Sequence, residues 1–285
     1  MRLLLALGAG VAVIAGVALW LIGSILARPA PAVLGPPPAG LVEAQFESRS
    51  GATLKAWVAP VAAARAAAVL MHPLGGNRQS MLGRVRLMNS LGVAALAFDF
   101  SAHGESTGEN ISFGYLESRD ARAAVRFARE RWPGLPVFVI GVSLGGVAAL
   151  LADPPLEVEG MILESVYPEI STATSNRLAL RFPYAELATP LLVAQLPLRL
   201  GIDAEELAPV NRARFITVPV LLMSGSRDRR TTEADTRRLF AAFPGRKRLV
   251  LFEGASHQNL RAFDRPTYDA TVSAFVEELW SRLSP

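Results

Sequence analysis

The sequence predicts an α/β fold in which a mostly parallel sheet carries helices on both faces. Short apolar runs alternate with longer helix-compatible stretches along most of the 285 residues, and this alternation is typical of parallel strands joined by crossover helices. A second indication is the β-branched apolar run at 137–140, which leads directly into a Gly-x-Ser-x-Gly motif and another helical stretch. Hydrophobic residues make up 51% of the chain and charged residues 19%, so it can bury a core and is not intrinsically disordered.

The expected strands begin with a hairpin, formed by residues 41–48 and 53–60 around the turn Arg49-Ser50-Gly51. Its two antiparallel strands would lie at one edge of the parallel sheet. Further strands are expected at residues 66–72, 93–100, 136–141, 158–164, 218–224 and 248–252. The helices are expected at residues 77–90, 115–132, 144–152, 231–243 and 266–283.

Residues 166–213 interrupt this alternation, because they form a long interval between two expected strands. Connections in α/β units usually take a few residues and one helix. This interval holds a leucine-rich stretch at 187–200 and three prolines, Pro183, Pro190 and Pro197, which disfavour a single long crossover helix. The sequence therefore predicts a small helical cap inserted at about residues 166–213.

The first residues of the chain predict a membrane anchor. Residues 3–26 contain no charged side chain, and a run of this length can cross a hydrocarbon core of about 30 Å as a helix. A cleaved signal peptide is the alternative, although its apolar region usually has only about 7–15 residues. The predicted organisation is a transmembrane anchor at 1–28, a Pro-rich linker at 29–40 and a main domain at 41–285.

The charges that flank the predicted anchor bear on its orientation. Arg2 precedes it and Arg28 follows it, so the bias from basic residues is slight. A one-residue basic tail is more easily left in the cytoplasm than moved across the membrane. We therefore expect a single-pass membrane protein whose main domain lies outside the cytoplasm, with the membrane as a partner through the N-terminal helix.

Composition excludes several classes of site. The chain has no cysteine, which excludes disulfides, thiolate catalysis and cysteine-ligated metals. Its three histidines, His72, His103 and His257, show no metal-ligand spacing, and we expect neither a metal nor a cofactor. The net charge is +4, and the basic residues are scattered along the sequence without interleaved aromatic residues, so no nucleic-acid partner is expected.

The motif at residues 141–145 makes Ser143 the candidate nucleophile. A serine on a sharp turn between a strand and a helix projects its hydroxyl above the sheet from a strained backbone. Gly141 and Gly145 flank it, and larger side chains there would collide across the turn. The motif alone is common, and its strand and helix context is what makes it specific.

A serine hydroxyl needs a base to remove its proton, and the base is usually a histidine held by a carboxylate. His257 is the only histidine after Ser143, and Asp228 lies in the loop after the preceding expected strand. This gives the chain order Ser, Asp, His that accompanies the motif. Two alternatives stay open: Asp228 could only cap the following helix, with Asp235 or Glu233 as the acid, and His257 could be a surface residue.

Two backbone N–H groups are candidates for an oxyanion hole. One belongs to Leu144, directly after the candidate nucleophile, and the other to Leu74 in the loop 72–77 that follows an earlier strand. In this interpretation His72 forms structural hydrogen bonds within its loop. His103 precedes the nucleophile, which is the wrong order for the base, and we expect it in a turn.

Five loops together resemble the α/β-hydrolase superfamily, and within it the Bem46-like and serine-aminopeptidase-like membrane-anchored esterases. The loops lie at residues 72–77, 99–106, 141–146, 225–228 and 254–259. Pro73 stands where the family usually has a second glycine. The resemblance implies the α/β-hydrolase fold and hydrolysis of an ester, thioester or amide through an acyl-enzyme, without a cofactor.

The leucine-rich cap and the predicted anchor favour an ester or thioester of a hydrophobic acyl group, a small-molecule or lipid-like substrate presented near the bilayer. Equally, the leucines could simply pack the cap against the main domain. A peptidase or amidase with the same triad is the alternative, and Glu164 or Glu169 could then anchor a substrate amine. A non-catalytic binding protein is the second alternative, against which the intact Ser, Asp and His argue.

Overall fold

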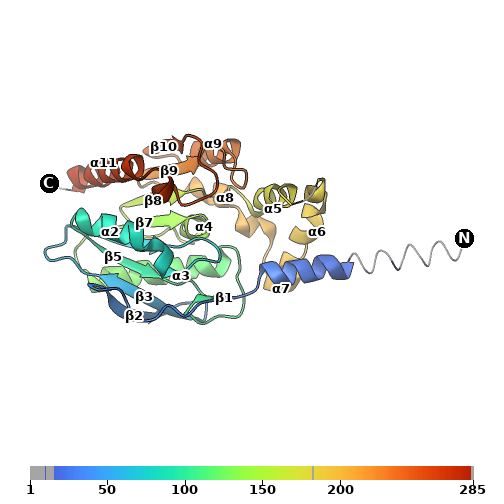
Figure 1. Ribbon diagram of the computed structural model, residues 1–285, viewed down its shortest axis with the longest axis horizontal. Helices are drawn as coiled ribbons and strands as arrows, with labels where there is room; N and C mark the ends of the chain where they lie inside the picture. Colours follow the sequence, from blue (N-terminus) through green and yellow to red (C-terminus); the bar gives the residue numbers. More distant parts are fainter. Residues whose placement is uncertain (1–9, 11–15, 182, 284–285) are drawn as a thin grey trace, which may run out of the picture.

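An eight-stranded sheet forms the centre of the computed structural model, which describes residues 10, 16–181 and 183–283. The strand order is β10-β9-β8-β7-β4-β5-β3-β2 (Figure 1). The bounds are β2 (Val42–Glu47), β3 (Thr53–Ala59), β4 (Ala66–Met71), β5 (Val93–Phe98), β7 (Val137–Val142), β8 (Gly160–Glu164), β9 (Val220–Gly225) and β10 (Lys247–Phe252). In this sheet β3 pairs antiparallel with both β2 and β5, and the other pairings are parallel. The predicted α/β fold with an antiparallel edge is confirmed.

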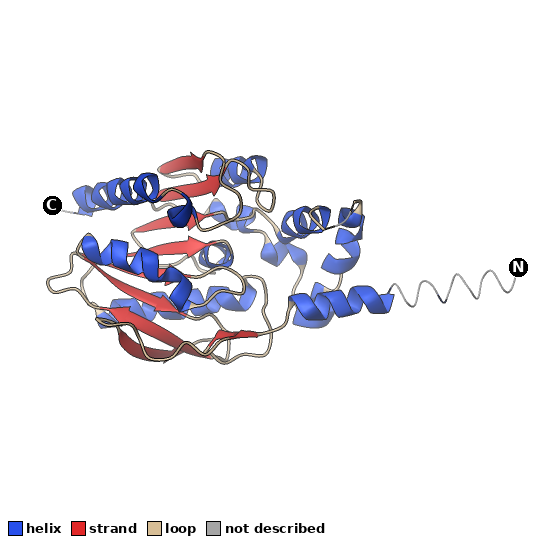
Figure 2. Cartoon of the chain, viewed as in Figure 1, coloured by secondary structure: helices blue, strands red, loops and turns tan. Residues whose placement is uncertain are grey.

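Helices cover both faces of this sheet (Figure 2). The main ones are α2 (Leu82–Ser90), α3 (Tyr115–Arg131), α4 (Leu144–Leu151), α9 (Glu233–Ala242), α10 (Leu260–Phe263) and α11 (Arg265–Leu283), and the short 3-10 helix η1 (Arg78–Met81) precedes α2. In β4, Val69 belongs to the core formed with α3, α4 and α9, whereas its neighbour Leu70 belongs to the core formed with α2 and α11. Because successive strand residues face opposite sides, a strand buried on both faces is continuously apolar.

Short helices fill the interval between β8 and β9. They are α5 (Ile170–Ala179), η2 (Ala185–Ala188), α6 (Thr189–Val193), α7 (Leu196–Leu200), η3 (Ala204–Leu207) and α8 (Pro209–Ala213). Pro190, Pro197 and Pro209 each lie in the first turn of a helix, where the missing backbone N–H costs nothing. The prolines therefore divide this segment, which we call the cap, into several helices in place of one.

An N-terminal helix at residues 16–26 lies beside α7 of the cap (Figure 1). The guanidinium of Arg199 donates hydrogen bonds to the backbone oxygen of Trp20 and, over 2.9 Å, to Ser24 Oγ. It also lies 3.7 Å from the centre of the Trp20 ring. Gln195 Nε2 donates to the Leu19 oxygen over 3.3 Å. Hydrogen bonds from Gln195 and Arg199 to the backbone of this helix and to Ser24 thus hold it against the cap.

The predicted membrane span lies partly outside the described residues, since residues 1–9 and 11–15 are not among them. In the part of the chain that the structure describes, no helix is both long and apolar enough to cross a bilayer. The transmembrane anchor therefore stays a prediction.

The segment after this helix pairs with the main domain. Ala30 and Pro31 form a short strand, β1, parallel to β6 (His103–Gly104), and the Ala30 N–H donates to the Ala102 oxygen over 2.8 Å. Just before it, the Ala27 oxygen accepts a hydrogen bond from the Ile111 N–H over 3.0 Å. The Pro-rich linker is therefore docked on the loop that follows β5.

Candidate active site

Ser143 lies on the turn between β7 and α4, with φ 49° and ψ −108°. Such a backbone is costly for a residue with a side chain and persists only where its surroundings enforce it. Here the Ser143 N–H donates to the Glu164 oxygen over 2.8 Å, and the Ser143 oxygen accepts from the Val147 N–H over 3.0 Å. The candidate nucleophile thus occupies the strained strand-to-helix turn that the sequence predicts.

Glycine is required beside this turn because backbone and side-chain atoms of neighbouring segments lie very close. A Cβ on Gly145 would stand 2.2 Å from the Met71 oxygen at the end of β4, and one on Gly146 would stand 2.2 Å from Val166 Cγ2. Contacts of this length cannot be relieved by a small side-chain movement. The spacing of the motif is therefore fixed by how closely α4 approaches β4 and the segment after β8.

Asp228 and His257 meet in the loops that follow β9 and β10. His257 Nδ1 lies 2.7 Å from Asp228 Oδ2, while Asp228 Oδ1 accepts from the N–H groups of Arg230 at 2.8 Å and Thr231 at 2.9 Å. Asp228 is buried and His257 is partly exposed. The carboxylate therefore caps the local turn with one oxygen and orients the imidazole with the other, leaving Nε2 of His257 available as a base.

The two alternative acids are engaged elsewhere. Asp235 accepts hydrogen bonds from Thr232 at the start of α9, and Glu233 pairs with Arg237 one turn later.

Ser143 reaches the same edge of the sheet as this pair, because parallel strands β7, β9 and β10 all end there. In the part of the chain that the structure describes, the Ser143 hydroxyl forms no hydrogen bond with His257. Hydrogen bonds between a nucleophile and its base are often long without substrate and shorten when it binds.

The two predicted oxyanion donors lie on neighbouring elements. Leu144 is the first residue of α4, whose N-terminal N–H groups have no partner within the helix. Leu74 lies in a turn after β4, closed by the Gly76 N–H on the Pro73 oxygen over 2.9 Å. Since β4 and β7 are adjacent strands, both residues follow neighbouring strand ends.

His72 connects the two loops behind this turn. Its Nδ1 lies 2.8 Å from the Pro73 oxygen and its Nε2 accepts from the Phe100 N–H over 3.0 Å. Burial, together with the nearby His103 and against the hydrogen bond to Pro73, lowers the pKa of His72 to about 3. A neutral imidazole with Nδ1 protonated satisfies both bonds, which is the structural role expected from the sequence.

We expect stability to depend on His72 between pH 7 and pH 5. The unfolded chain takes up this proton near pH 6.5 and the native protein near pH 3, so the contribution is complete above 6.5 and is lost as pH falls. The loss should reach about 2 kcal/mol at pH 5. Denaturant unfolding of wild type and His72→Gln at both pH values isolates it, because titrations of other groups cancel in the difference. Identical pH dependence of the two proteins would contradict this.

A buried ionic cluster lies beneath the nucleophile turn, and sequence analysis did not find it. The carboxylate of Glu164 accepts from Arg84 Nε over 2.7 Å and from the Tyr268 hydroxyl over 2.6 Å. Burial, together with this carboxylate, raises the pKa of Tyr268. Because the backbone oxygen of Glu164 also holds the Ser143 N–H, the cluster supports the position of the serine.

This cluster also bears on the peptidase alternative. Glu164 is fully engaged with Arg84 and Tyr268, and Glu169 pairs with Arg238 at 3.0 Å. Glu164 is therefore not free to anchor a substrate amine, and Glu169 would first have to give up its pair with Arg238. No group of three or more potential metal ligands is found within the described residues.

Comparison with known proteins found a matching family model and several related proteins. A family model described as serine aminopeptidase, S33, matches residues 62–205. Human monoglyceride lipase is 27% identical over 233 residues, which cover 70% of this chain and 77% of that protein. The uncharacterized protein YqkD of Bacillus subtilis is 28% identical over 219 residues, covering 74% of this chain and 71% of its own.

Solved structures resemble the chain in fold. The esterase Pf2001 of Pyrococcus furiosus superimposes with a TM-score of 0.70 and 19% sequence identity, covering 88% of this chain and 99% of the esterase. A carboxyl esterase of Bacillus coagulans gives a TM-score of 0.65 at 15% identity, covering 85% of this chain and 99% of that one.

Proposed function

We propose that this chain, which belongs to the serine aminopeptidase S33 family and is an esterase- or lipase-like hydrolase with the α/β-hydrolase fold, cleaves an ester or thioester of a hydrophobic acyl group. The reaction would pass through an acyl-enzyme on Ser143. The observation that carries the proposal is the 2.7 Å hydrogen bond between His257 and Asp228, at the sheet edge where the strained Ser143 turn also lies. A carboxylate on Nδ1 fixes the imidazole tautomer and stabilises the imidazolium that forms when Nε2 takes up a proton, as a general base requires.

The proposed reaction has two halves. His257 Nε2 takes the proton of the Ser143 hydroxyl as Oγ attacks the substrate carbonyl carbon, and the Leu144 and Leu74 N–H groups stabilise the resulting oxyanion. The tetrahedral intermediate collapses when the protonated His257 gives its proton to the departing alcohol or thiol. In the second half His257 takes a proton from water, the hydroxide attacks the acyl carbonyl, and Ser143 leaves with the proton.

The exposed surface of the cap supports a hydrophobic substrate. Leu187 and Leu198 are 76% and 79% exposed, and Leu191 is 58% exposed. Leucines that only packed the cap onto the main domain would be buried, as Leu192 and Leu196 are. In this proposal the exposed leucines together form an apolar patch, the kind of surface that meets another apolar phase.

The N-terminal helix extends this apolar surface. Leu21 and Ile25 are 55% and 62% exposed, and Arg199 fastens their helix to α7 of the cap. A helix and cap that enter the same bilayer face would deliver acyl chains from the membrane to the serine. In this proposal the protein is a single-pass membrane protein whose catalytic domain lies outside the cytoplasm.

Two substrates test the proposal on the full chain in neutral detergent or vesicles. We expect turnover of p-nitrophenyl esters that rises from acetate toward long acyl chains, and hydrolysis of a monoacylglycerol embedded in phosphatidylcholine vesicles. The variant Leu187→Ser/Leu191→Ser/Leu198→Ser should retain turnover of soluble p-nitrophenyl butyrate and lose most activity on the vesicles. A folded wild type that hydrolyses no ester would refute the proposed chemistry. Equal loss on both substrates would refute the role of the cap surface.

A peptidase or amidase with the same triad is the alternative that the family description favours. The occupied state of Glu164 and Glu169 speaks against an amine-anchored peptide substrate. Turnover of aminoacyl p-nitroanilides in place of esters would favour this alternative.

A further inference from the structure

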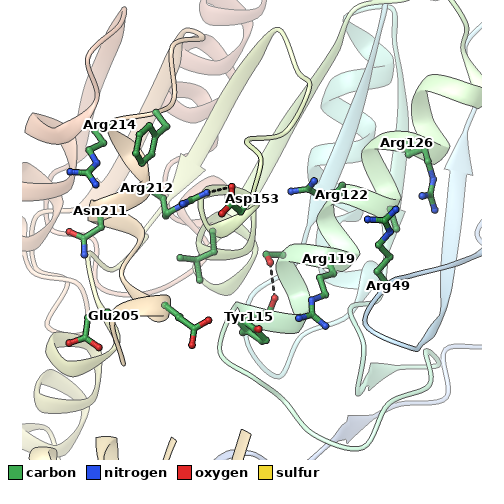
Figure 3. Close-up of a pocket in the computed structure, with 15 residues that line it drawn as sticks. Arg49, Tyr115, Arg119, Arg122, Arg126, Asp153, Glu205, Asn211, Arg212 and Arg214 are labelled. Carbon is green, nitrogen blue, oxygen red and sulfur yellow. Dashed lines mark hydrogen bonds and ion pairs between the residues drawn. The ribbon is translucent and has the colours of Figure 1, made fainter. Parts of the chain in front are cut away.

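A cleft of about 750 Å³ opens between α3, the end of α4 and the η3–α8 part of the cap (Figure 3). Ser143, Asp228 and His257 are not among the described residues that line it. Ser143 directly precedes α4, whereas Leu151, which lines the cleft, is the last residue of that helix. The length of the helix, about 12 Å, therefore separates the two places. The cleft is therefore distinct from the candidate active site.

Arginines dominate the lining of this cleft. Six of them face three carboxylates, and one carboxylate, Asp153, is paired with Arg212 at 2.7 Å. The arginines come from three parts of the chain: the β2–β3 turn, α3 and α8 with the residues after it. They are Arg49, Arg119, Arg122, Arg126, Arg212 and Arg214. Positive charges that are scattered in the sequence are thus gathered by the fold around one concave surface.

Most of these guanidinium groups lack a carboxylate partner. Within the described residues, Arg49, Arg119 and Arg122 have no carboxylate oxygen within 4.0 Å, and Arg126 has only the exposed Glu130 at 3.9 Å. Burial lowers the pKa of Arg122, and the charges of Arg49 and Arg212 lower it further, against Asp153. The fold therefore holds several like charges near one another, which an anion between them would stabilise.

A solvated basic face explains this arrangement only in part. Arg122 Nη2 donates a hydrogen bond over 2.6 Å to the backbone oxygen of Pro154, which lies just after α4. The Arg119 guanidinium lies 4.8 Å from the centre of the Tyr115 ring. These contacts position two side chains. They do not account for Arg49, which reaches the same cleft from a hairpin turn on another part of the sheet edge.

We propose that this cleft binds a phosphate-bearing anion with at least two negative charges. The guanidinium fork matches the oxygens of a phosphate group in bidentate hydrogen bonds, and arginines on opposite walls suit two phosphoryl groups better than one carboxylate. The phosphate could be free in solution or belong to a lipid headgroup, and the same side chains would recognise either. This site does not depend on the proposed hydrolase chemistry.

Calorimetric titration of the full chain in neutral detergent tests the proposal with two probes. One is inorganic pyrophosphate and the other is dioctanoyl phosphatidylinositol 4,5-bisphosphate. We expect saturable binding of at least one probe that weakens with added salt. Arg49→Gln/Arg122→Gln should raise its dissociation constant at least about tenfold. Arg49→Gln alone keeps the Arg122 hydrogen bond to Pro154, and should weaken binding by a smaller factor even if the double variant folds poorly.

The matched control is Arg86→Gln/Arg131→Gln, which removes the same charge from two exposed arginines that do not line the cleft. It should bind both probes as wild type does. Binding of pyrophosphate supports a soluble ligand, and binding of the lipid headgroup alone supports a membrane source. Absence of binding by wild type at millimolar probe, or equal weakening in the control, would overturn the proposal.

Discussion

Ser143→Ala is expected to lower kcat for p-nitrophenyl butyrate by about 10⁴-fold or more, because removal of a triad nucleophile leaves only the contributions of binding and the oxyanion hole. The melting temperature should change little, since alanine meets the same backbone strain at φ 49° as serine does. Steady-state hydrolysis and thermal melting of purified full-length protein provide both measurements.

Ser165→Ala is a matched control for this experiment. Ser165 is also buried, also has a positive φ, of 50°, and follows the neighbouring strand β8. It should retain nearly all activity, because among the described residues its side-chain hydroxyl has no hydrogen-bond partner. Its hydrogen bonds to the Met223 oxygen and from the Thr231 hydroxyl involve only its backbone. Equal activity of wild type and Ser143→Ala would show that hydrolysis comes from another group.

Glu164→Gln should produce the largest loss of stability, about 3–5 kcal/mol, because it leaves the buried Arg84 without a countercharge. Both side chains of the pair are almost completely buried, so water cannot replace the lost interaction. Urea unfolding measures the effect. Removing both charges in Arg84→Met/Glu164→Leu should recover part of it, since a buried ion pair can be replaced by apolar groups at little cost.

Glu233→Gln is the exposed counterpart. It breaks the pair with Arg237 on the surface of α9, in which both side chains are largely solvated, and should cost no more than about 0.5 kcal/mol. If Glu164→Gln were no more destabilising than Glu233→Gln, the buried cluster would have no structural importance.

The sheet could be predicted from the sequence because its parallel strands are buried on both faces. The apolar run expected at 66–72 became β4 (Ala66–Met71), and the run at 93–100 became β5 (Val93–Phe98). The stretch expected as one helix at 77–90 is divided into η1 and α2. The pairing of β1 with β6 was not foreseen, because Ala30 and Pro31 show no strand pattern and pair only through their backbone.

The candidate triad followed from the rule that parallel strands end at one edge of a sheet, since Ser143, Asp228 and His257 each lie in a loop after a predicted strand. The cluster around Glu164 did not follow, since its partners Arg84 and Tyr268 are 80 and 104 residues away in sequence. The arginine-lined cleft was missed for the same reason. Contacts between segments that are distant in sequence leave no periodic pattern by which the cluster or the cleft could be predicted.

The docked linker leaves the N-terminal helix little freedom to move relative to the sheet. Ala27 is held by Ile111 and Ala30 by Ala102, so only residues 28 and 29 lie between two points of attachment, a reach of about 10 Å at most. A tether this short cannot let the domain swing freely. Whatever surface receives the helix therefore meets the rest of the protein at a fixed height and tilt.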